Sequence, residues 1–542
     1  MRRLESRLSA NVFLHVPSSS ARKSRRTLLF FVPGNPGLIG YYHPFLALVA
    51  RGLRGVESEG GQEDKNGTSS ESRAKAVVAG FSLGGFDVDE EPCQCGSKKK
   101  GEGEKQQQQQ EGGGSDPSRC DEWQDREGTD GNEDMISTRN SRASVVEDRE
   151  LLYPPSFPLR SRNSMQQEDK SKGDGKGSCT AAEQDQIYTL GEQIELTYAR
   201  VEYLVHRLHE QGSTSTDILE QESVQVVLMG HSVGAYIALE LVRLWHERHH
   251  RRAQQLQTPS HTTAGSYGKD DDPSRSASNS PETRDGAPSR PSWVISTCIL
   301  LTPTIQDIHL SPSGRLATPA LSYLPFLPGL AHMLLHAVLL RLLPSAWFSL
   351  LVSRATGMQT WSHGFETTMA FLRSRRGVRQ ALCMARGEMA EIRSETWGRE
   401  VWGASHHGGS SSDAMTAAED GRGASTTSPR LYFWFAKKDH WIADVTKEAI
   451  FASRATGVGV QRDCLARPQT KTEFVETDEV DFTAESTTGA ARIQILETEA
   501  MDHAWCLNQS EFVARRVSSW LREVLDTDDS PLYDGAPFQP AI

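Results

Sequence analysis

The chain has 542 residues, a hydrophobic fraction of 37% and a formal net charge of −12. This mild acidity gives no reason to expect a nucleic-acid partner, because nucleic-acid-binding domains carry a basic surface. The eight cysteines follow no disulfide spacing, which favours a reducing compartment. Cys93-x-Cys95 has no second ligand pair nearby, and Met1–Ser6 is charged and lacks the apolar core of a secretory signal. We therefore expect no metal, no cofactor and no secretory signal.

Five segments are rich in Ser, Gly, Gln and charged residues and lack apolar periodicity. They are residues 57–75, 89–185, 252–292, 403–429 and 466–490. Such sequences bury too little apolar surface to offset the entropy of the chain, so they are predicted to be disordered insertions. The remainder, on the order of 300 residues, is enough for one well-buried domain. We expect residues 1–542 to form a single domain interrupted by these insertions.

Apolar strands alternate with helical patterns outside these segments. The predicted strands are Thr27–Val32, Ala76–Ala79, the run from Val226, Trp293–Leu301, Leu431–Ala436 and Ile493–Leu496. The predicted helices are Tyr41–Leu53, Ile187–Leu208, the segment after Ser232 and Glu511–Leu525. This alternation predicts an α/β fold with a mostly parallel, doubly wound sheet. Active sites in such sheets lie at the carboxyl ends of the strands.

The strongest functional motif is Gly230-His231-Ser232-Val233-Gly234, between an apolar strand and an amphipathic helix. A strand–turn–helix of this kind presents a serine hydroxyl as a nucleophile, and glycines on either side allow strand and helix to pack closely. The backbone N–H of Val233, at the start of the helix, is placed to stabilise an oxyanion. Ser232 is therefore the predicted nucleophile.

A second match to the same pattern, Gly80-Phe81-Ser82-Leu83-Gly84, provides a comparison. It is followed by the acidic segment Gly85–Pro92, which has no helical periodicity. Ser82 therefore lacks the helix N-terminus that an activated serine needs, and we do not expect it to be catalytic.

A serine nucleophile needs a base and an acid that orients the base. His503 follows the last predicted strand and precedes the last helix, which is where this architecture places the base. Asp439 follows the penultimate strand and is the first candidate for the acid. Asp307, after the strand Trp293–Leu301, is the alternative. Asp444 is also a possible helix N-cap, and Asp502 adjoins the histidine too closely in sequence to reach its ring.

The loop Pro33-Gly34-Asn35-Pro36-Gly37 follows the first predicted strand, where such enzymes place a second oxyanion donor. Pro36 has no N–H, so Asn35 is the natural donor, with Gly34 allowing close approach. A tight turn without a catalytic role is the alternative interpretation.

Residues 316–354 are predominantly apolar, and Leu316–Leu340 contains no charged side chain. Prolines at 325, 328 and 344 leave a proline-free helix, Gly329–Leu343, of 15 residues. A membrane span needs roughly 20. The segment therefore suggests a cap over the active site or a helix lying in a lipid interface, with a fully buried cap as the alternative.

Several sequence blocks outside the insertions together carry a resemblance to one known family. They are Val32–Gly37 with Tyr42-x-Pro44-Phe45, Ile187–Glu195, Gly230–Tyr236, Pro303-Thr304-Ile305, Ser311–Pro319, Asp439-x-Trp441 and His503-Ala504. In these blocks the chain resembles the lipid droplet-associated hydrolase family. It departs from the family at Ser82–Phe86, where histidines are usual.

The resemblance implies an α/β-hydrolase fold, a Ser232–His503–Asp439 triad, and a place on lipid droplets and the endoplasmic reticulum. It also implies a serine hydrolase that cleaves lipid esters of the sterol ester or acylglycerol type. Because the same triad cleaves thioesters and small esters, an acyl-thioesterase or small-ester carboxylesterase is the alternative enzyme. A droplet-bound scaffold with little turnover is the alternative outside catalysis. The sequence gives no indication of oligomeric state.

Overall fold

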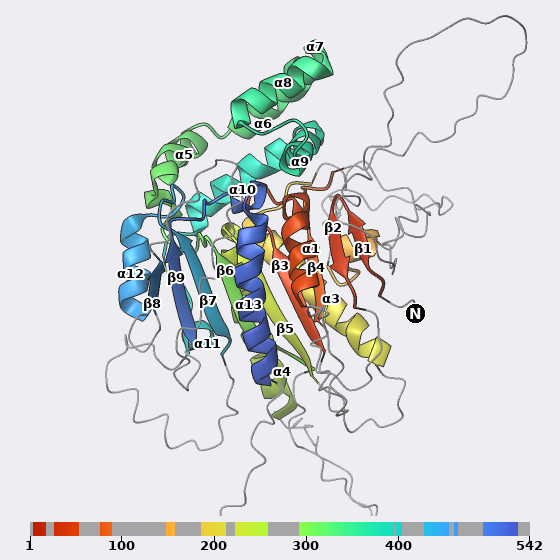
Figure 1. Cartoon of the computed structure of the whole chain (residues 1–542), viewed down its shortest axis with the longest axis vertical. Helices are drawn as coiled ribbons and strands as arrows, with labels where there is room; N and C mark the ends of the chain where they lie inside the picture. Colours follow the sequence, from red (N-terminus) through yellow and green to blue (C-terminus); the bar gives the residue numbers. More distant parts are fainter. Residues whose placement is uncertain are drawn as a thin grey trace, which may run out of the picture.

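A nine-stranded sheet runs through the described part of the chain, with strand order β1-β2-β4-β3-β5-β6-β7-β9-β8 (Figure 1). The computed structural model describes residues 4–17, 26–53, 76–88, 148–157, 186–212, 223–257, 292–394, 396–403, 428–454, 460–463 and 492–528. The strands are β1 (Arg7–Ser9), β2 (Val12–His15), β3 (Thr27–Val32), β4 (Ala76–Phe81), β5 (Val224–His231), β6 (Trp293–Leu301), β7 (Arg430–Ala436), β8 (Val460–Asp463) and β9 (Ile493–Thr498). Strand β2 pairs antiparallel with β1 and β4, and every other neighbouring pair is parallel.

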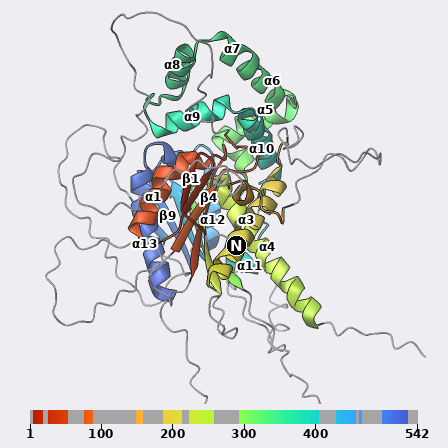
Figure 2. The ribbon, with the colours of Figure 1, turned by 90° about the vertical axis from the view of Figure 1, so that its right-hand side faces the viewer.

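Helices cover both faces of this sheet. Helices α1 (His43–Gly52) and α13 (Ser510–Asp528) pack together on one face, and α3 (Leu190–Gly212) and α4 (Val233–Gln257) pack together on the other (Figure 2). Further helices are α9 (His363–Arg373), α10 (Gly377–Glu391), α11 (Arg399–Trp402) and α12 (Asp444–Arg454). Short 3-10 turns are η1 (Ile39–Tyr42), η5 (Ile308–Leu310) and η7 (Trp505–Leu507). The expected mostly parallel, doubly wound α/β architecture is confirmed.

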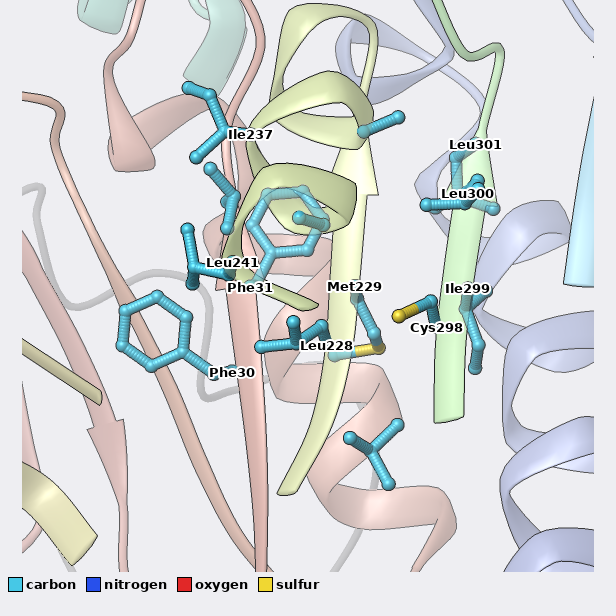
Figure 3. Close-up of a cluster of buried hydrophobic side chains, with 14 of the residues drawn as sticks. Phe30, Phe31, Leu228, Met229, Ile237, Leu241, Cys298, Ile299, Leu300 and Leu301 are labelled. Atoms are coloured by element: carbon cyan, nitrogen blue, oxygen red, sulfur yellow. The ribbon is translucent and has the colours of Figure 1, made fainter. Parts of the chain in front are cut away.

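The core lies where the central strands meet helix α4. Strands β3 and β5 are buried along their whole length, because helices cover both faces of the sheet at this point. Ile237 and Leu241 lie one turn apart on α4, and their buried side chains pack against the strands. Figure 3 shows this contact, with Phe30, Phe31, Leu228, Met229, Cys298, Ile299, Leu300 and Leu301 around it.

The parallel register brings the ends of β3, β4, β5, β6, β7 and β9 to one edge of the sheet. The last paired residues are Phe31 and Gly80, Val32 and Gly230, His231 and Leu301, Leu301 and Trp434, and Ala436 and Thr498. The segments that follow these strands carry Asn35, Ser232, Asp439 and His503. Backbone pairing therefore places together loops that are far apart in the sequence.

Several features differ from the sequence-based expectations. The short hairpin β1–β2 was not predicted, because strands of three and four residues carry little periodicity. Residues 148–157 fall inside the expected insertion 89–185, yet they contain a helical turn whose Leu151 and Leu152 join the core. Helix α4 continues to Gln257, past the expected start of the insertion 252–292. Most of the five expected insertions lies outside the described residues, so their disorder stays a prediction.

The predicted proline-free helix Gly329–Leu343 corresponds to a continuous helix over Leu327–Leu342, which is separated from its neighbours at Pro325 and Pro344. The apolar segment consists of five consecutive elements. They are α5 (Pro312–Tyr323), α6 (Leu327–Met333), the π-helical turn η6 (Leu334–Leu339), α7 (Leu340–Leu342) and α8 (Ser345–Thr356). With α9 they gather beyond one end of the sheet (Figure 1). The Ser313 N–H donates to the carbonyl oxygen of His440 at 2.9 Å, which ties α5 to the loop after β7. These helices therefore lie at the carboxyl edge of the sheet, the edge at which the parallel strands end.

Large apolar side chains of this segment face outward. The exposed fraction is 78% for Leu316, 82% for Tyr323 and 68% for Trp347. The interpretation as a fully buried cap is therefore wrong. No single described helix is long and apolar enough to cross a membrane, although Pro312–Tyr323 with Leu327–Leu342 passes the same length and composition test as a pair bent by 91°.

Candidate active site

Ser232 occupies a strained turn between β5 and α4. Its φ is 53°, in the left-handed region that few residues other than glycine adopt, and its side chain is half-buried. A Cβ at Gly230 would lie 2.4 Å from the carbonyl oxygen of Gly234, and one at Gly234 would lie 2.2 Å from that of Val32. Both glycines are therefore required by close backbone packing, as the motif predicts.

His503 lies between the serine and an aspartate. Its Nε2 is 3.0 Å from Ser232 Oγ, and its Nδ1 is 2.7 Å from Asp439 Oδ2. The other oxygen of Asp439 accepts a hydrogen bond of 2.8 Å from the Trp441 N–H, and the aspartate side chain is almost fully buried. With Nδ1–H donating to the carboxylate, Nε2 is left as an acceptor for the serine proton.

The other aspartates considered from the sequence lie elsewhere. Asp307 precedes η5 with a left-handed φ of 49° and makes no hydrogen bond to His503. Asp444 begins α12 and pairs with Lys447 at 3.6 Å. The Asp502 backbone N–H donates to Gln509 rather than toward the site. Asp439 is thus the candidate that contacts the histidine.

The predicted oxyanion donors come from two elements. Val233 is the first residue of α4, so its N–H has no partner within the helix. The Asn35 side chain points away from the turn, because its Nδ2 donates to Ala381 O at 3.0 Å and to Glu388 Oε1 at 2.9 Å in α10. Only the backbone N–H of Asn35 remains available to an oxyanion. A Cβ at Gly34 would lie 3.0 Å from that of Ser232, which shows how near the loop approaches.

Ser82 is a buried residue whose hydrogen bonds belong to the core of the fold. It is fully buried, its Oγ accepts a hydrogen bond from the Ile39 N–H, and its carbonyl oxygen accepts one from the buried Arg200. No helix begins in the described residues that follow it, as far as Val88. This arrangement agrees with the expectation that Ser82 is not a nucleophile.

Sequence reasoning did not assign four residues that adjoin the site. Thr304 Oγ1 lies 3.5 Å from Ser232 Oγ, and the Thr304 N–H donates to the Ser232 carbonyl. His231 and Tyr42 are hydrogen-bonded to each other beside the nucleophile. Glu388, in α10, holds Asn35. His231, Tyr42 and Thr304 carried a signal, because each lies in a block that supports the family resemblance, whereas Glu388 carried none.

The fold and this arrangement together define the class of protein. A doubly wound sheet with a serine on the turn after β5, an aspartate after β7 and a histidine after β9 makes it an α/β-hydrolase. The family model for lipid-droplet associated hydrolases matches residues 25–111 and 159–506, which is most of the chain. The chain belongs to the lipid-droplet associated hydrolase family. It is therefore an enzyme, an ester hydrolase by its family and its serine-type site.

Several solved structures with a related fold match the chain at low sequence identity. A peroxisomal α/β-hydrolase from Saccharomyces cerevisiae matches at 10% identity and a TM-score of 0.37, over 98% of this chain and 85% of its own. A carboxylesterase from Nitrososphaera gargenis matches at 8% identity and a TM-score of 0.32, over 97% and 99%. A juvenile hormone epoxide hydrolase from Bombyx mori gives 9% and 0.33, over 96% and 74%. Likenesses this weak say nothing about substrate.

Proposed function

We propose that the protein is a serine hydrolase that cleaves lipid esters, of the sterol ester or acylglycerol type, at the lipid droplet surface. The observation that carries this proposal is the position of His503, whose two ring nitrogens reach Ser232 and Asp439. This is the arrangement that activates a hydroxyl for attack on a carbonyl carbon. The strained φ of Ser232 supports the same role, because strained backbone conformations cluster at active sites.

The first half of the reaction forms an acyl-enzyme. Ser232 Oγ attacks the ester carbonyl carbon while His503 Nε2 accepts the hydroxyl proton. The carbonyl oxygen gains the negative charge, which the backbone N–H groups of Val233 and Asn35 stabilise. The imidazolium then gives its proton to the departing alcohol oxygen as the carbon–oxygen bond breaks. Asp439 stabilises the charged imidazolium throughout.

Water completes the cycle. It attacks the acyl carbon, gives a proton to His503, and releases the fatty acid as that proton returns to Ser232 Oγ. Atoms and charges balance, with one ester and one water giving one alcohol and one acid.

The segment from α5 to α8 supports action at a lipid surface. It lies at the carboxyl edge that carries Ser232, and its outer side exposes large apolar side chains. Between residues 308 and 365 the chain has no Asp or Glu, and its charged residues there are Arg315, Arg341 and Arg354. Apolar insertion with a few cations suits an interface of phospholipid headgroups over neutral lipid.

The remaining finer assignments belong to the same proposal. We include the endoplasmic reticulum as a second location, one domain over residues 1–542, and disordered insertions at the segments given above. We further assign Asn35 and Val233 to the oxyanion hole. The lipid droplet itself follows from family membership.

A fluorophosphonate probe tests the proposal directly, because it reacts only with an activated serine. Wild type is expected to react, Ser232→Ala to lose all reaction, and Ser82→Ala to react as the wild type does. The reactive protein is then given cholesteryl oleate, triolein and an acyl-thioester, each presented in phospholipid-coated droplets.

Two outcomes would overturn the proposal. Wild-type protein that stays unreactive on droplets, although folded, would favour a scaffold with little turnover. Reaction followed by turnover of the thioester or a small soluble ester alone would favour the alternative enzymes.

A further inference from the structure

The residue before the nucleophile makes two hydrogen bonds that the proposed chemistry does not require. His231 Nδ1 lies 2.7 Å from the hydroxyl oxygen of Tyr42, and His231 Nε2 lies 2.8 Å from the backbone carbonyl oxygen of His503. The Tyr42 oxygen also accepts a hydrogen bond of 3.1 Å from the Gly34 N–H. These contacts join three segments: the oxyanion loop (Pro33–Gly37), the serine turn, and the base loop (Glu499–Ala504).

The direction of each hydrogen bond follows from the two groups at the ends of the hydrogen-bond chain, each of which can act only as a donor or only as an acceptor. The Gly34 N–H only donates, and the carbonyl oxygen of His503 only accepts. Nε2 of His231 must therefore carry the proton. In a neutral ring Nδ1 then accepts, so the Tyr42 hydroxyl donates to it. The chain of donors runs from Gly34 through Tyr42 to His231, whose Nε2–H points to His503.

The surroundings hold His231 in this neutral form. The ring and the Tyr42 side chain are both buried. Burial, helped by the nearby His503, lowers the pKa of His231 to about 3. The buried indole of Trp505 meets both rings edge-on, with centroids 5.8 Å from Tyr42 and 5.3 Å from His231. The Cys506 thiol lies against the Tyr42 hydroxyl.

The three joined segments each carry one part of the proposed chemistry. Gly34 precedes Asn35, whose backbone N–H is the proposed oxyanion donor. His231 precedes Ser232. The carbonyl group that accepts from Nε2 belongs to His503, the proposed base. A shift of any one segment would change distances that must hold within a few tenths of an ångström.

We infer that His231, held in one neutral tautomer by Tyr42, is a positioning residue that fixes the oxyanion loop and the base loop to the serine turn. This inference rests on the proposed function, since it assigns the segments their roles. It adds a role for two residues that touch neither the ester nor the reacting proton. It predicts that breaking the chain of hydrogen bonds lowers the rate of serine acylation without weakening the binding of substrate.

The first experiment measures the rate of fluorophosphonate reaction for Tyr42→Phe and His231→Gln. The Gln amide keeps a donor near the Nε2 position but loses the acceptor for Tyr42. Each variant is expected to react at least tenfold more slowly than wild type. Tyr41→Phe is the matched control, because the Tyr41 hydroxyl is also buried but bonds to Thr368 at 2.9 Å. It should stay within twofold of wild type.

Two further readouts separate positioning from loss of structure. With an ester substrate, Tyr42→Phe should lower kcat and leave KM within twofold. In addition, because both changes interrupt one chain, the double variant should react no more than twofold more slowly than the slower single variant. The inference fails if Tyr42→Phe behaves like Tyr41→Phe, or if the two losses multiply.

An NMR measurement of the His231 ring does not depend on activity, so it tests the inference even if Tyr42→Phe and His231→Gln fail to fold. In ¹⁵N-histidine-labelled Ser232→Ala protein, the His231 ring is identified by its through-space contacts with the Trp505 indole, whose centroid lies 5.3 Å away. It should show Nε2 protonated and Nδ1 unprotonated from pH 6 to 8. The opposite tautomer, or a ring that titrates in this range, would overturn the inference. If wild type does not react with the probe while this signature is found, the proposed function fails and the hydrogen-bond network stands.

Discussion

The Asn35 side-chain amide donates a hydrogen bond of 2.9 Å to Oε1 of Glu388, and so links the oxyanion loop to helix α10. Glu388 is buried, and burial raises the pKa of its carboxyl group to about 7, against an ordinary value of 4.5. The hydrogen bond from Asn35 opposes this shift only partly. The two residues are 353 positions apart in the chain.

Glu388→Gln should change how stability depends on pH. Because the folded state holds the proton more tightly, the contribution of Glu388 is fully present below pH 4.5 and is lost as the pH rises through about 7. The unfolding free energy of wild type minus that of the variant should therefore fall between these pH values, by roughly 3 kcal/mol at most. Urea denaturation at pH 5, 6, 7 and 8 measures this difference. A constant difference would contradict the prediction.

Asp439→Asn should remove most of the activity and leave the fold intact. The amide has nearly the same shape but no longer stabilises the protonated His503 or fixes its tautomer. We expect kcat to fall by about three to four orders of magnitude. Asp307→Asn is the matched control and should keep kcat within twofold. A large loss in that control, with little loss in Asp439→Asn, would move the acid to the end of β6.

Gly234→Ala should disrupt the serine turn. The new methyl group would lie 2.2 Å from the carbonyl oxygen of Val32, which belongs to backbone and has little room to move. We expect a loss of stability of about 1–3 kcal/mol or more, with no probe reaction at Ser232. Gly191→Ala, in α3, meets nothing within 4 Å and should be neutral or slightly stabilising. Thermal unfolding with probe labelling distinguishes the two variants.

Tyr323→Ser combined with Trp347→Ser should weaken binding to lipid. Both side chains are exposed, at 82% and 68%, on the segment proposed to meet the droplet. Burying one such side chain in an apolar phase contributes about 1.5–3 kcal/mol, so binding to phospholipid-coated triolein droplets should fall at least tenfold. Hydrolysis of a soluble ester should stay within twofold of wild type.

Val445→Ser controls for the loss of an exposed apolar side chain elsewhere. Val445 is 64% exposed on α12, outside the segment from α5 to α8. Flotation of each protein with the droplets gives the bound fraction. Equal binding by the double variant and the control would show that another surface contacts lipid.

Sequence patterns predicted those parts of the fold that are determined by residues close together in the chain. The run Thr27–Val32 is buried on both faces, and a continuous apolar run is the expected sequence of such a strand. The serine turn was predictable because its glycines, its strand and its helix are adjacent in sequence. The breaks on either side of Leu327–Leu342 were predictable, because Pro325 and Pro344 follow the ends of α5 and α7. The π-helical turn Leu334–Leu339 was not predicted, because the apolar composition there is uniform.

The choice of acid illustrates what the sequence left open. Asp439 and Asp307 each follow a buried strand, and nothing local separates them. Only the pairing of β7 with β9 brings Asp439, and not Asp307, against His503. The roles of Tyr42 and Glu388 depend in the same way on contacts across the folded molecule, which no local pattern encodes.

Asp439 and His503 are 64 positions apart, yet the pairing of Ala436 with Thr498 at the ends of β7 and β9 sets their separation. We therefore expect the covalent connection between them to be dispensable. A protein made as two polypeptides, divided within residues 464–491, would carry the aspartate on one and the histidine on the other. Insertion of β9 between β7 and β8, both on the first polypeptide, would bring them together again, and recovery of probe reaction on mixing would measure this fragment complementation.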